Sequence, residues 1–150
     1  MMPLHLFYDF KAPAWDDALV TSREAQGGER TDGFETLREM LAWGAVSLFR
    51  IANAPKSCKG SFKGDDADFM TNFDAVMSSL GFDQPIPTGP FCRLYERPDV
   101  VMVCRGAPRV DLGHRRTFQL GGGSDGSLRR ILGELATARV VELEVKKWGV

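Results

Sequence analysis

The sequence predicts an α+β domain, in which three or four helices pack on a mainly antiparallel sheet of five or six strands. Three observations support this class. Several short segments alternate apolar and polar residues, as half-buried strands do. Other segments carry an apolar residue every three to four positions, as amphipathic helices do. A short proline-containing loop also joins two neighbouring strand patterns, which is typical of an antiparallel hairpin.

Size and composition indicate one domain over residues 1–150, long enough to bury a substantial core. The formal charge is −1, with 8 Lys/Arg and 13 Asp/Glu in residues 1–83 but 11 and 7 in residues 84–150. A nearly neutral chain without a basic tail carries no specific nucleic-acid signal. No apolar run reaches the roughly 20 residues of a membrane span, and three cysteines without paired spacing indicate no secreted disulfide framework. We expect a cytoplasmic protein without a membrane partner.

The first half of the chain predicts a strand over residues 4–10 and a helix that starts at Pro13 and ends at Gly27 and Gly28. A second helix starts near Asp32 and ends at Trp43 and Gly44. The run AVSLFRIA over 45–52 is mostly apolar at both odd and even positions, which favours a central strand covered on both faces. The alternative is that this run prolongs the preceding helix. The next residues, NAPKSCKGSFKG, are rich in Gly, Lys and Ser and predict an exposed loop. Asp65 or Asp66 caps a third helix, which stops at Gly81.

Two strands over 91–96 and 100–105 form a predicted hairpin around the loop 97–99. A three-residue loop sets a register that places Cys92 opposite Cys104. In that register one apolar face serves the core, and it consists of Cys92, Leu94, Met102 and Cys104. The reverse face is also apolar and consists of Phe91, Tyr95, Val101 and Val103.

Residues 109–145 predict a strand, a glycine turn, a capped helix and a last strand. Apolar residues at alternate positions indicate the first strand. Gly121, Gly122 and Gly123 then allow the backbone to turn. Oxygens of Ser124, Asp125 or Ser127 cap the helix. Its apolar stripe, at the spacing of a helix lying on a sheet, is Leu128, Ile131, Leu132 and Leu135. In the last strand Val141, Leu143 and Val145 alternate with Glu142, Glu144 and Lys146.

A glycine turn that leads into a helix is a candidate anion site, because free amides and the positive end of the helix dipole converge there. The candidate ligand-binding residues of the turn are Gly121, Gly122, Gly123, Ser124 and Ser127. Three further candidates nearby in sequence are His114, Arg116 and Arg129. His114 and Arg116 alternate in step with the buried residues of this strand, so their side chains are expected to point inward. A cation there needs a carboxylate partner or a pocket, unless a bulge at Gly113 turns both side chains outward. The alternative is a flexible turn that binds nothing.

The same segment resembles a known family. A strand, a glycine-rich turn, GSLRRILGELATA and another strand are similar to the pyrophosphate-binding segment of the GNAT acetyltransferases. Gly126, Ser127 and Leu128 lie where that family has its glycine and first helical turn. Gln119, Gly122 and Ser124 follow its Arg/Gln-x-x-Gly-x-Gly/Ala pattern loosely. The resemblance covers about 30 residues and implies an acetyltransferase-like enzyme, although the family has a further helix and two strands after the last strand of this sequence.

Other chemistry-bearing patterns are sparse. Lys56, Lys59 and Lys63 flank Cys58, and nearby positive charge lowers a thiol pKa, so we expect Cys58 to be the most reactive cysteine, unless the loop is merely solvated. The chain has no HExxH, CxxC or glycine-elbow serine. We therefore expect no metal site and no cofactor, and we assign no catalytic residue.

Two functional hypotheses follow. The first is a small cytosolic non-enzymatic binding or accessory protein, acting as a homodimer through Phe91, Tyr95, Val101 and Val103, unless a helix or the 81–90 segment covers that face. The second is a small enzyme or sensor that binds a small anionic, phosphate-bearing ligand at the Gly121–Ser127 turn. The absence of catalytic motifs favours the first hypothesis, while the question of enzymatic activity stays open.

Overall fold

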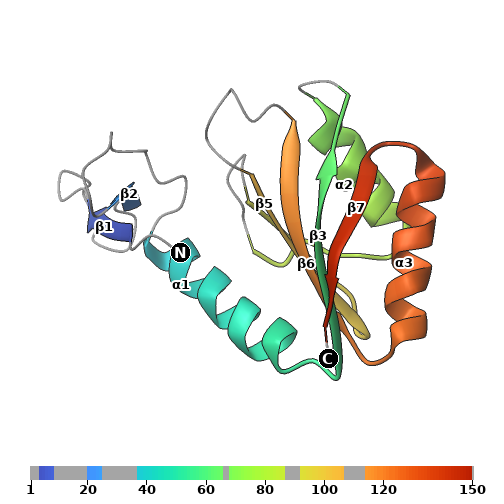
Figure 1. The fold of residues 1–150 in the computed structure, drawn as a ribbon, viewed down its shortest axis with the longest axis horizontal. Helices are drawn as coiled ribbons and strands as arrows, with labels where there is room; N and C mark the ends of the chain where they lie inside the picture. The colour runs from blue at the N-terminus through green and yellow to red at the C-terminus, as the bar shows by residue number, and fades with distance from the viewer. Residues whose placement is uncertain are drawn as a thin grey trace.

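The structure is a computed structural model, and it describes residues 4–8, 20–24, 37–65, 68–86, 92–106 and 114–149. The chain order is shown in Figure 1. The elements are β1 (Leu4–Tyr8), β2 (Val20–Glu24), α1 (Leu37–Val46), the π-helix η2 (Ser47–Ala52), β3 (Lys56–Lys63), α2 (Phe69–Ser79), β4 (Cys92–Glu96), β5 (Val100–Gly106), β6 (Arg115–Gly122), α3 (Asp125–Ala138) and β7 (Glu142–Trp148).

Five strands form one antiparallel sheet in the order β4-β5-β6-β3-β7. β6 and β7 both pair with β3 in the antiparallel sense, and α3 carries the chain from one to the other across it. The predicted α+β class with a mainly antiparallel sheet is confirmed. β1 and β2 pair separately in a two-stranded sheet, and the assignment of residues 1–150 to one domain stays a prediction.

One face of the sheet carries the larger core, under α2 and α3 (Figure 1). Phe62 of β3 is buried there and stacks on Phe73 of α2, with ring centroids 4.7 Å apart. The predicted stripe of α3 is confirmed, since Leu128, Ile131, Leu132 and Leu135 are all buried. This face holds the amphipathic helices that the sequence pattern identifies.

The opposite face carries a smaller core beneath α1 and η2. Trp43 of α1 and Ile51 of η2 are buried against the hairpin of β4 and β5. The predicted end of the helix at Gly44 is wrong, because the helix continues through Val46 into η2. The strand favoured over 45–52 is also wrong, and the alternative of a longer helix is confirmed. Only Ile51 is buried in η2, whereas Leu48 and Phe49 are exposed, so the run does not have two covered faces.

The exposed loop predicted over 53–64 is wrong, because most of it forms β3 between β6 and β7. Its residues alternate: Cys58 and Phe62 point into the α2/α3 core, while Lys59 and Lys63 are exposed. Gly60 lets β7 approach, since a Cβ at this position would overlap the carbonyl oxygen of Glu144. The period of two outweighs the Gly, Lys and Ser composition that suggested a loop.

The helix predicted from Pro13 to Gly27 and Gly28 is wrong where Val20–Glu24 forms β2; residues 13–19 and 25–28 lie outside the described part. The helix predicted to stop at Gly81 is confirmed as α2, and Gly81 has φ +83°. Asp68, rather than Asp65 or Asp66, is its N-cap.

The hairpin is confirmed, but its predicted register is wrong by one residue. The Arg97 amide donates to the Val100 carbonyl oxygen at 2.9 Å, so the loop has two residues, Pro98 and Asp99. Cys92 therefore lies opposite Arg105, and Arg93 lies opposite Cys104. A shift of one residue exchanges the faces of a strand, and Cys92 and Cys104 lie in different cores.

The segment after residue 114 follows the prediction most closely. Ser124 caps α3 by accepting a hydrogen bond from the Ser127 amide at 3.2 Å. Two of the three turn glycines, Gly121 and Gly122, are the last residues of β6 instead. β7 contains a bulge, so that Val145 pairs with Gly60 but Lys147 pairs with Lys59.

Candidate functional site

Gly121, Gly122, Gly123 and Ser127 line a cleft of about 290 Å³, here called the glycine cleft. Arg50, Ala54, Pro98 and Asp99 are among the residues on its other walls. Gly121 lies so close to the Ile51 backbone that an added Cβ would be 3.0 Å from its Cα. Gly121 therefore permits close packing of β6 against η2, while Gly122 lies against Leu128 of α3.

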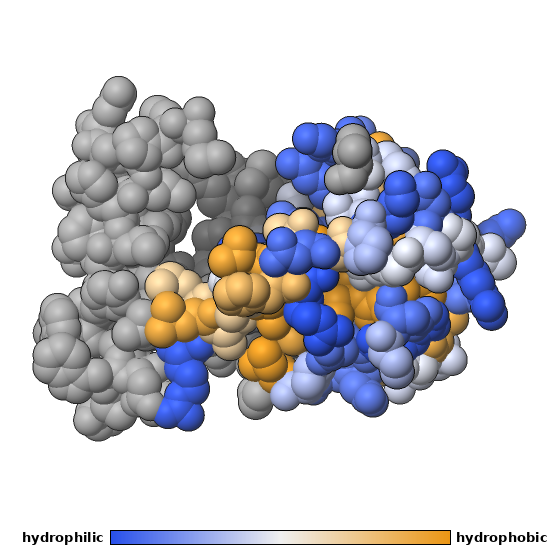
Figure 2. Space-filling view, turned by 90° about the horizontal axis from the view of Figure 1, so that it is seen from below, coloured by the Kyte–Doolittle hydropathy of each residue, from blue (hydrophilic) through white to orange (hydrophobic). Residues whose placement is uncertain are grey.

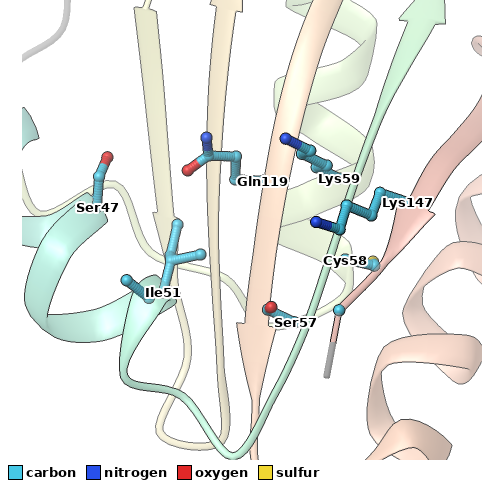
Figure 3. Close-up of a pocket in the computed structure, with 9 residues that line it drawn as sticks. Ser47, Ile51, Ser57, Cys58, Lys59, Gln119 and Lys147 are labelled. Carbon is cyan, nitrogen blue, oxygen red and sulfur yellow. The ribbon is translucent and has the colours of Figure 1, made fainter.

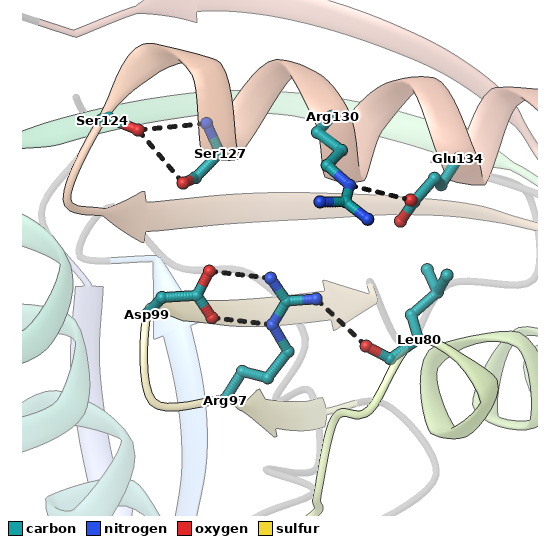
Figure 4. A network of polar contacts seen from close by, with 7 residues as sticks. All are labelled: Leu80, Arg97, Asp99, Ser124, Ser127, Arg130 and Glu134. Atoms are coloured by element: carbon teal, nitrogen blue, oxygen red, sulfur yellow. Dashed lines mark hydrogen bonds and ion pairs between the residues drawn. The ribbon is translucent and has the colours of Figure 1, made fainter.

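The charges of the glycine cleft do not favour an anion. Asp99 lines it, and Arg97 donates two hydrogen bonds of 2.7 Å to the Asp99 carboxylate (Figure 4). This ion pair holds the pKa of Asp99 below its usual value. The Ser127 amide at the start of α3 is already bonded to Ser124. Arg50, the cation of the cleft, is paired with Glu96.

The other predicted ligand-binding residues are not brought to the glycine turn. Arg116 is the second residue of β6 and Gly122 is the last, so an extended strand of roughly 20 Å separates them. The Arg116 guanidinium lies 5.6 Å from the Phe69 ring centroid, and burial lowers its pKa. The His114 ring also meets Phe69, edge to face. Arg129 lies over the Trp148 ring at 4.7 Å.

The predicted interface residues are buried within the chain. Tyr95 is 0% exposed, Val101 2% and Val103 3%. Because of the register difference they do not share one face: Tyr95 lies in the α2/α3 core, and both valines pack in the core beneath α1. Phe91 lies outside the described residues. The second apolar face of the hairpin is thus covered by α1 and η2, which is the alternative that the sequence left open.

None of the three cysteines forms a disulfide, and all three are buried. Burial raises the pKa of the Cys58 thiol to about 11, so Cys58 is not an activated thiol. The effect expected of the neighbouring lysines is outweighed by burial of the thiol, and two of them, Lys59 and Lys63, lie on the opposite face of β3 from Cys58. Burial also raises the pKa values of Cys104 and Tyr95, and the Tyr95 hydroxyl donates to Asp74 at 2.5 Å.

A second cleft lies between η2 and the open part of the sheet, with a volume of about 340 Å³ (Figure 3). We call it the lysine cleft, because Lys59 of β3 and Lys147 of β7 line it. The remaining described lining residues are Ser47, Ile51, Ala52, Ser57, Cys58, Gln119 and Gly149. In Figure 3 the two lysine side chains extend from the sheet on the side of Gln119 and η2.

The bulge in β7 places the two lysines side by side. Up to Val145 the pairing would set Lys146 opposite Lys59, but the bulge leaves Lys146 out and sets Lys147 there. It also directs Trp148 to the other face, where its indole nitrogen donates to Asp125 at 2.9 Å. Bulges commonly redirect side chains in this way next to functional sites.

The lysine cleft is electropositive. No carboxylate is among its described lining residues, and within the described chain neither Lys59 nor Lys147 makes an ion pair. Glu144 on the same face interacts with Arg115 at 3.4 Å and accepts a hydrogen bond from Ser61. Sequence reasoning noted Lys59 but missed the site, because it took β3 for a loop and did not foresee the bulge. The alternation in KSCKGSFK was the available signal.

Comparisons with known proteins identify no relative: no family model, no curated protein and no solved structure matches the chain. The GNAT resemblance of residues 119–145 therefore has no support from a family match. Among the described residues no three His, Cys, Asp or Glu side chains are grouped to hold a metal ion. None of the described helices is long and apolar enough to cross a membrane.

Proposed function

We propose that the protein is a small cytosolic, non-enzymatic binding module that holds a small anionic ligand in the lysine cleft. One observation carries the proposal: Lys59 and Lys147 are directly opposed on neighbouring strands at the wall of a cleft, with no described carboxylate among the lining residues. Like charges in directly opposed positions of a sheet are destabilising. An anion held between the two ammonium groups would offset this repulsion.

The neutral groups of the cleft suit the same ligand. The hydroxyls of Ser47 and Ser57 and the amide of Gln119 supply hydrogen-bond donors. The volume of about 340 Å³ is at the small end of the range for small-molecule sites. Phosphate and carboxylate groups accept several hydrogen bonds at once, so both fit this set of donors.

The lining residues support binding rather than catalysis. The described lining includes no histidine or carboxylate, and the pKa of its thiol, Cys58, is raised to about 11. A general base or nucleophile active near neutral pH needs a pKa close to the working pH. The absence of a disulfide among the three cysteines also suits a reducing cytosol.

Calorimetric titration with phosphate and pyrophosphate tests the proposal. We expect binding that weakens as salt is added, because salt screens charge. Lys59→Gln and Lys147→Gln should each weaken pyrophosphate binding about tenfold, the effect of losing one charge-assisted hydrogen bond. Lys146→Gln is the matched control, since the bulge leaves Lys146 outside the described lining. Equal affinities for all four proteins, or no binding, would refute the proposal.

Self-association is the second candidate, carried by an apolar ridge on α1 and η2. Leu41, Leu48 and Phe49 are 61%, 57% and 66% exposed, and Figure 2 shows apolar residues gathered on this part of the molecule. Three such side chains expose on the order of 300 Å² of apolar surface per chain. A stable interface buries roughly 800 Å² of surface on each partner, which is far more. A homodimer through the ridge alone is therefore weak.

Sedimentation of the protein between about 10 and 500 μM tests the homodimer. We expect a monomer at the lower end, and any dimer at the upper end should disappear in Phe49→Asp. A stable dimer at 10 μM that Phe49→Asp leaves intact would place the interface elsewhere.

A further inference from the structure

A third hollow adjoins the lysine cleft. It has a volume of about 250 Å³ and shares Ser47 and Gln119 with the lysine cleft as lining residues. Its other described lining residues are Gly44, Val103, Arg105, Thr117 and Phe118. The two hollows therefore form one groove that follows α1 and η2 across the sheet from β7 to β5, with Ser47 and Gln119 at its middle.

The strand register gives the length of this groove. Lys147, Lys59, Gln119 and Val103 lie in one row across β7, β3, β6 and β5. Arg105 lies two residues beyond Val103 along β5, on the same face. With strand spacings near 4.8 Å and a rise near 3.4 Å per residue, the Cα of Arg105 is roughly 12 Å from that of Lys59 and roughly 16 Å from that of Lys147.

Charge is confined to the two ends of the groove. Lys59 and Lys147 stand at one end and Arg105 at the other, and no described carboxylate lines either hollow. Arg105 is absent from every ion pair of the described chain. Between the ends the lining consists of neutral groups, the polar Ser47, Thr117 and Gln119 and the apolar Val103.

We propose that the groove binds an elongated small molecule with an anionic group at each end and a largely neutral chain between them. This inference rests on the proposed function and extends it. The lysine pair holds one anionic group, and the Arg105 guanidinium holds the other. The intervening chain lies along Val103 and Gln119, beside α1 and η2. Once one end is bound, the other meets its cation at a high effective concentration, so two ends bind more tightly than one.

A series of α,ω-dicarboxylates from succinate to sebacate, each compared with the monocarboxylate of equal length, tests the two-ended site by calorimetry. We expect affinity to rise with chain length, and the best dicarboxylate to bind about tenfold more tightly than its monocarboxylate. Arg105→Gln should remove this advantage and leave pyrophosphate affinity unchanged. Arg139→Gln, which changes an exposed arginine outside both described linings, is the control.

The outcomes separate the two proposals. If pyrophosphate binds through Lys59 but dicarboxylates show no dependence on length, the two-ended groove is refuted and the proposed function stands. If Arg105→Gln weakens the binding of every anion to the same extent, Arg105 adds only general positive charge, and the two-ended site is again refuted. If no anion binds, both proposals fail. Circular dichroism of each variant confirms that it folds.

Discussion

The two faces of the five-stranded sheet differ in how they are covered. On the α2/α3 face, 18 of the described residues form one buried apolar cluster, whereas the cluster beneath α1 and η2 has six. The α1 face also buries the Trp43 indole nitrogen without a hydrogen-bond partner in the described chain. It borders all three of the clefts described above. The α2/α3 face therefore supplies most of the buried core, whereas the proposed ligand site lies on the α1 face.

The alternation of side chains along each strand produces this difference between the two faces. In β3 the residues that face α2 and α3 are Cys58, Gly60 and Phe62, and those on the other face include Lys59 and Lys63. On that second face, α1 packs only over the part formed by apolar residues of β4 and β5. At the other edge of the sheet, no described helix packs over this face of β3 and β7.

The largest effect should come from a matched pair of isoleucines, one on each face. Ile131→Ala should lower the free energy of unfolding by about 4 kcal/mol, and Ile51→Ala by about 2 kcal/mol, within the range for such truncations. Ile131 is enclosed by the α2/α3 core, whereas Ile51 borders the lysine cleft, where solvent fills the space that the side chain leaves. Urea denaturation measures both, and equal losses would contradict the difference between the faces.

The Cys58 thiol sharpens the comparison, because its strand borders the lysine cleft while its side chain lies in the α2/α3 core. Burial raises its pKa from 9.0 to about 11. Only the thiolate reacts with iodoacetamide, so alkylation at pH 8 should be about a hundredfold slower than in urea and should increase as pH approaches 11. Mass spectrometry locates the label. Rapid labelling of Cys58 in the folded protein at pH 8 would show that the thiol faces the cleft.

A pair of glycines tests how tightly β3 is enclosed by its neighbours. Gly60→Ala should destabilise the protein by about 1–3 kcal/mol, because the new methyl group meets the Glu144 backbone. Gly133→Ala is the control on the exposed side of α3, with no atom within 4 Å of the added Cβ, and should stabilise by up to about 1 kcal/mol. Thermal unfolding compares them, and a neutral Gly60→Ala would contradict the pairing of β3 with β7.

Much of the α2/α3 side was predictable from the sequence, because its signals are local. The stripe of α3 and its Ser124 cap each lie within a single element. The hairpin register was not predictable, since the choice between a two-residue and a three-residue loop reverses every side chain of one strand. Ile51 and Trp43 could not be assigned to a core until the position of α1 on the sheet was known.

The candidate site was less predictable than the fold. Glycines at 121 and 122 suggest an anion turn, yet they serve packing against η2 and Leu128. The lysine cleft depends on a bulge that pairs residues 59 and 147, which are distant in sequence. No single segment contains that information. His114, Arg116 and Arg129 were grouped with the turn by proximity in the sequence, whereas an extended strand and a helix carry them away from it.

Mapping of pyrophosphate binding by amide NMR tests the central claim most directly, because it compares both candidate clefts in one titration. We expect the amide signals of Ser57, Lys59, Gln119 and Lys147 to move with a common saturation curve, while those of Gly122, Gly123 and Ser127 stay in place. Movement confined to Gly122, Gly123 and Ser127 would contradict the account and return the anion site to the start of α3.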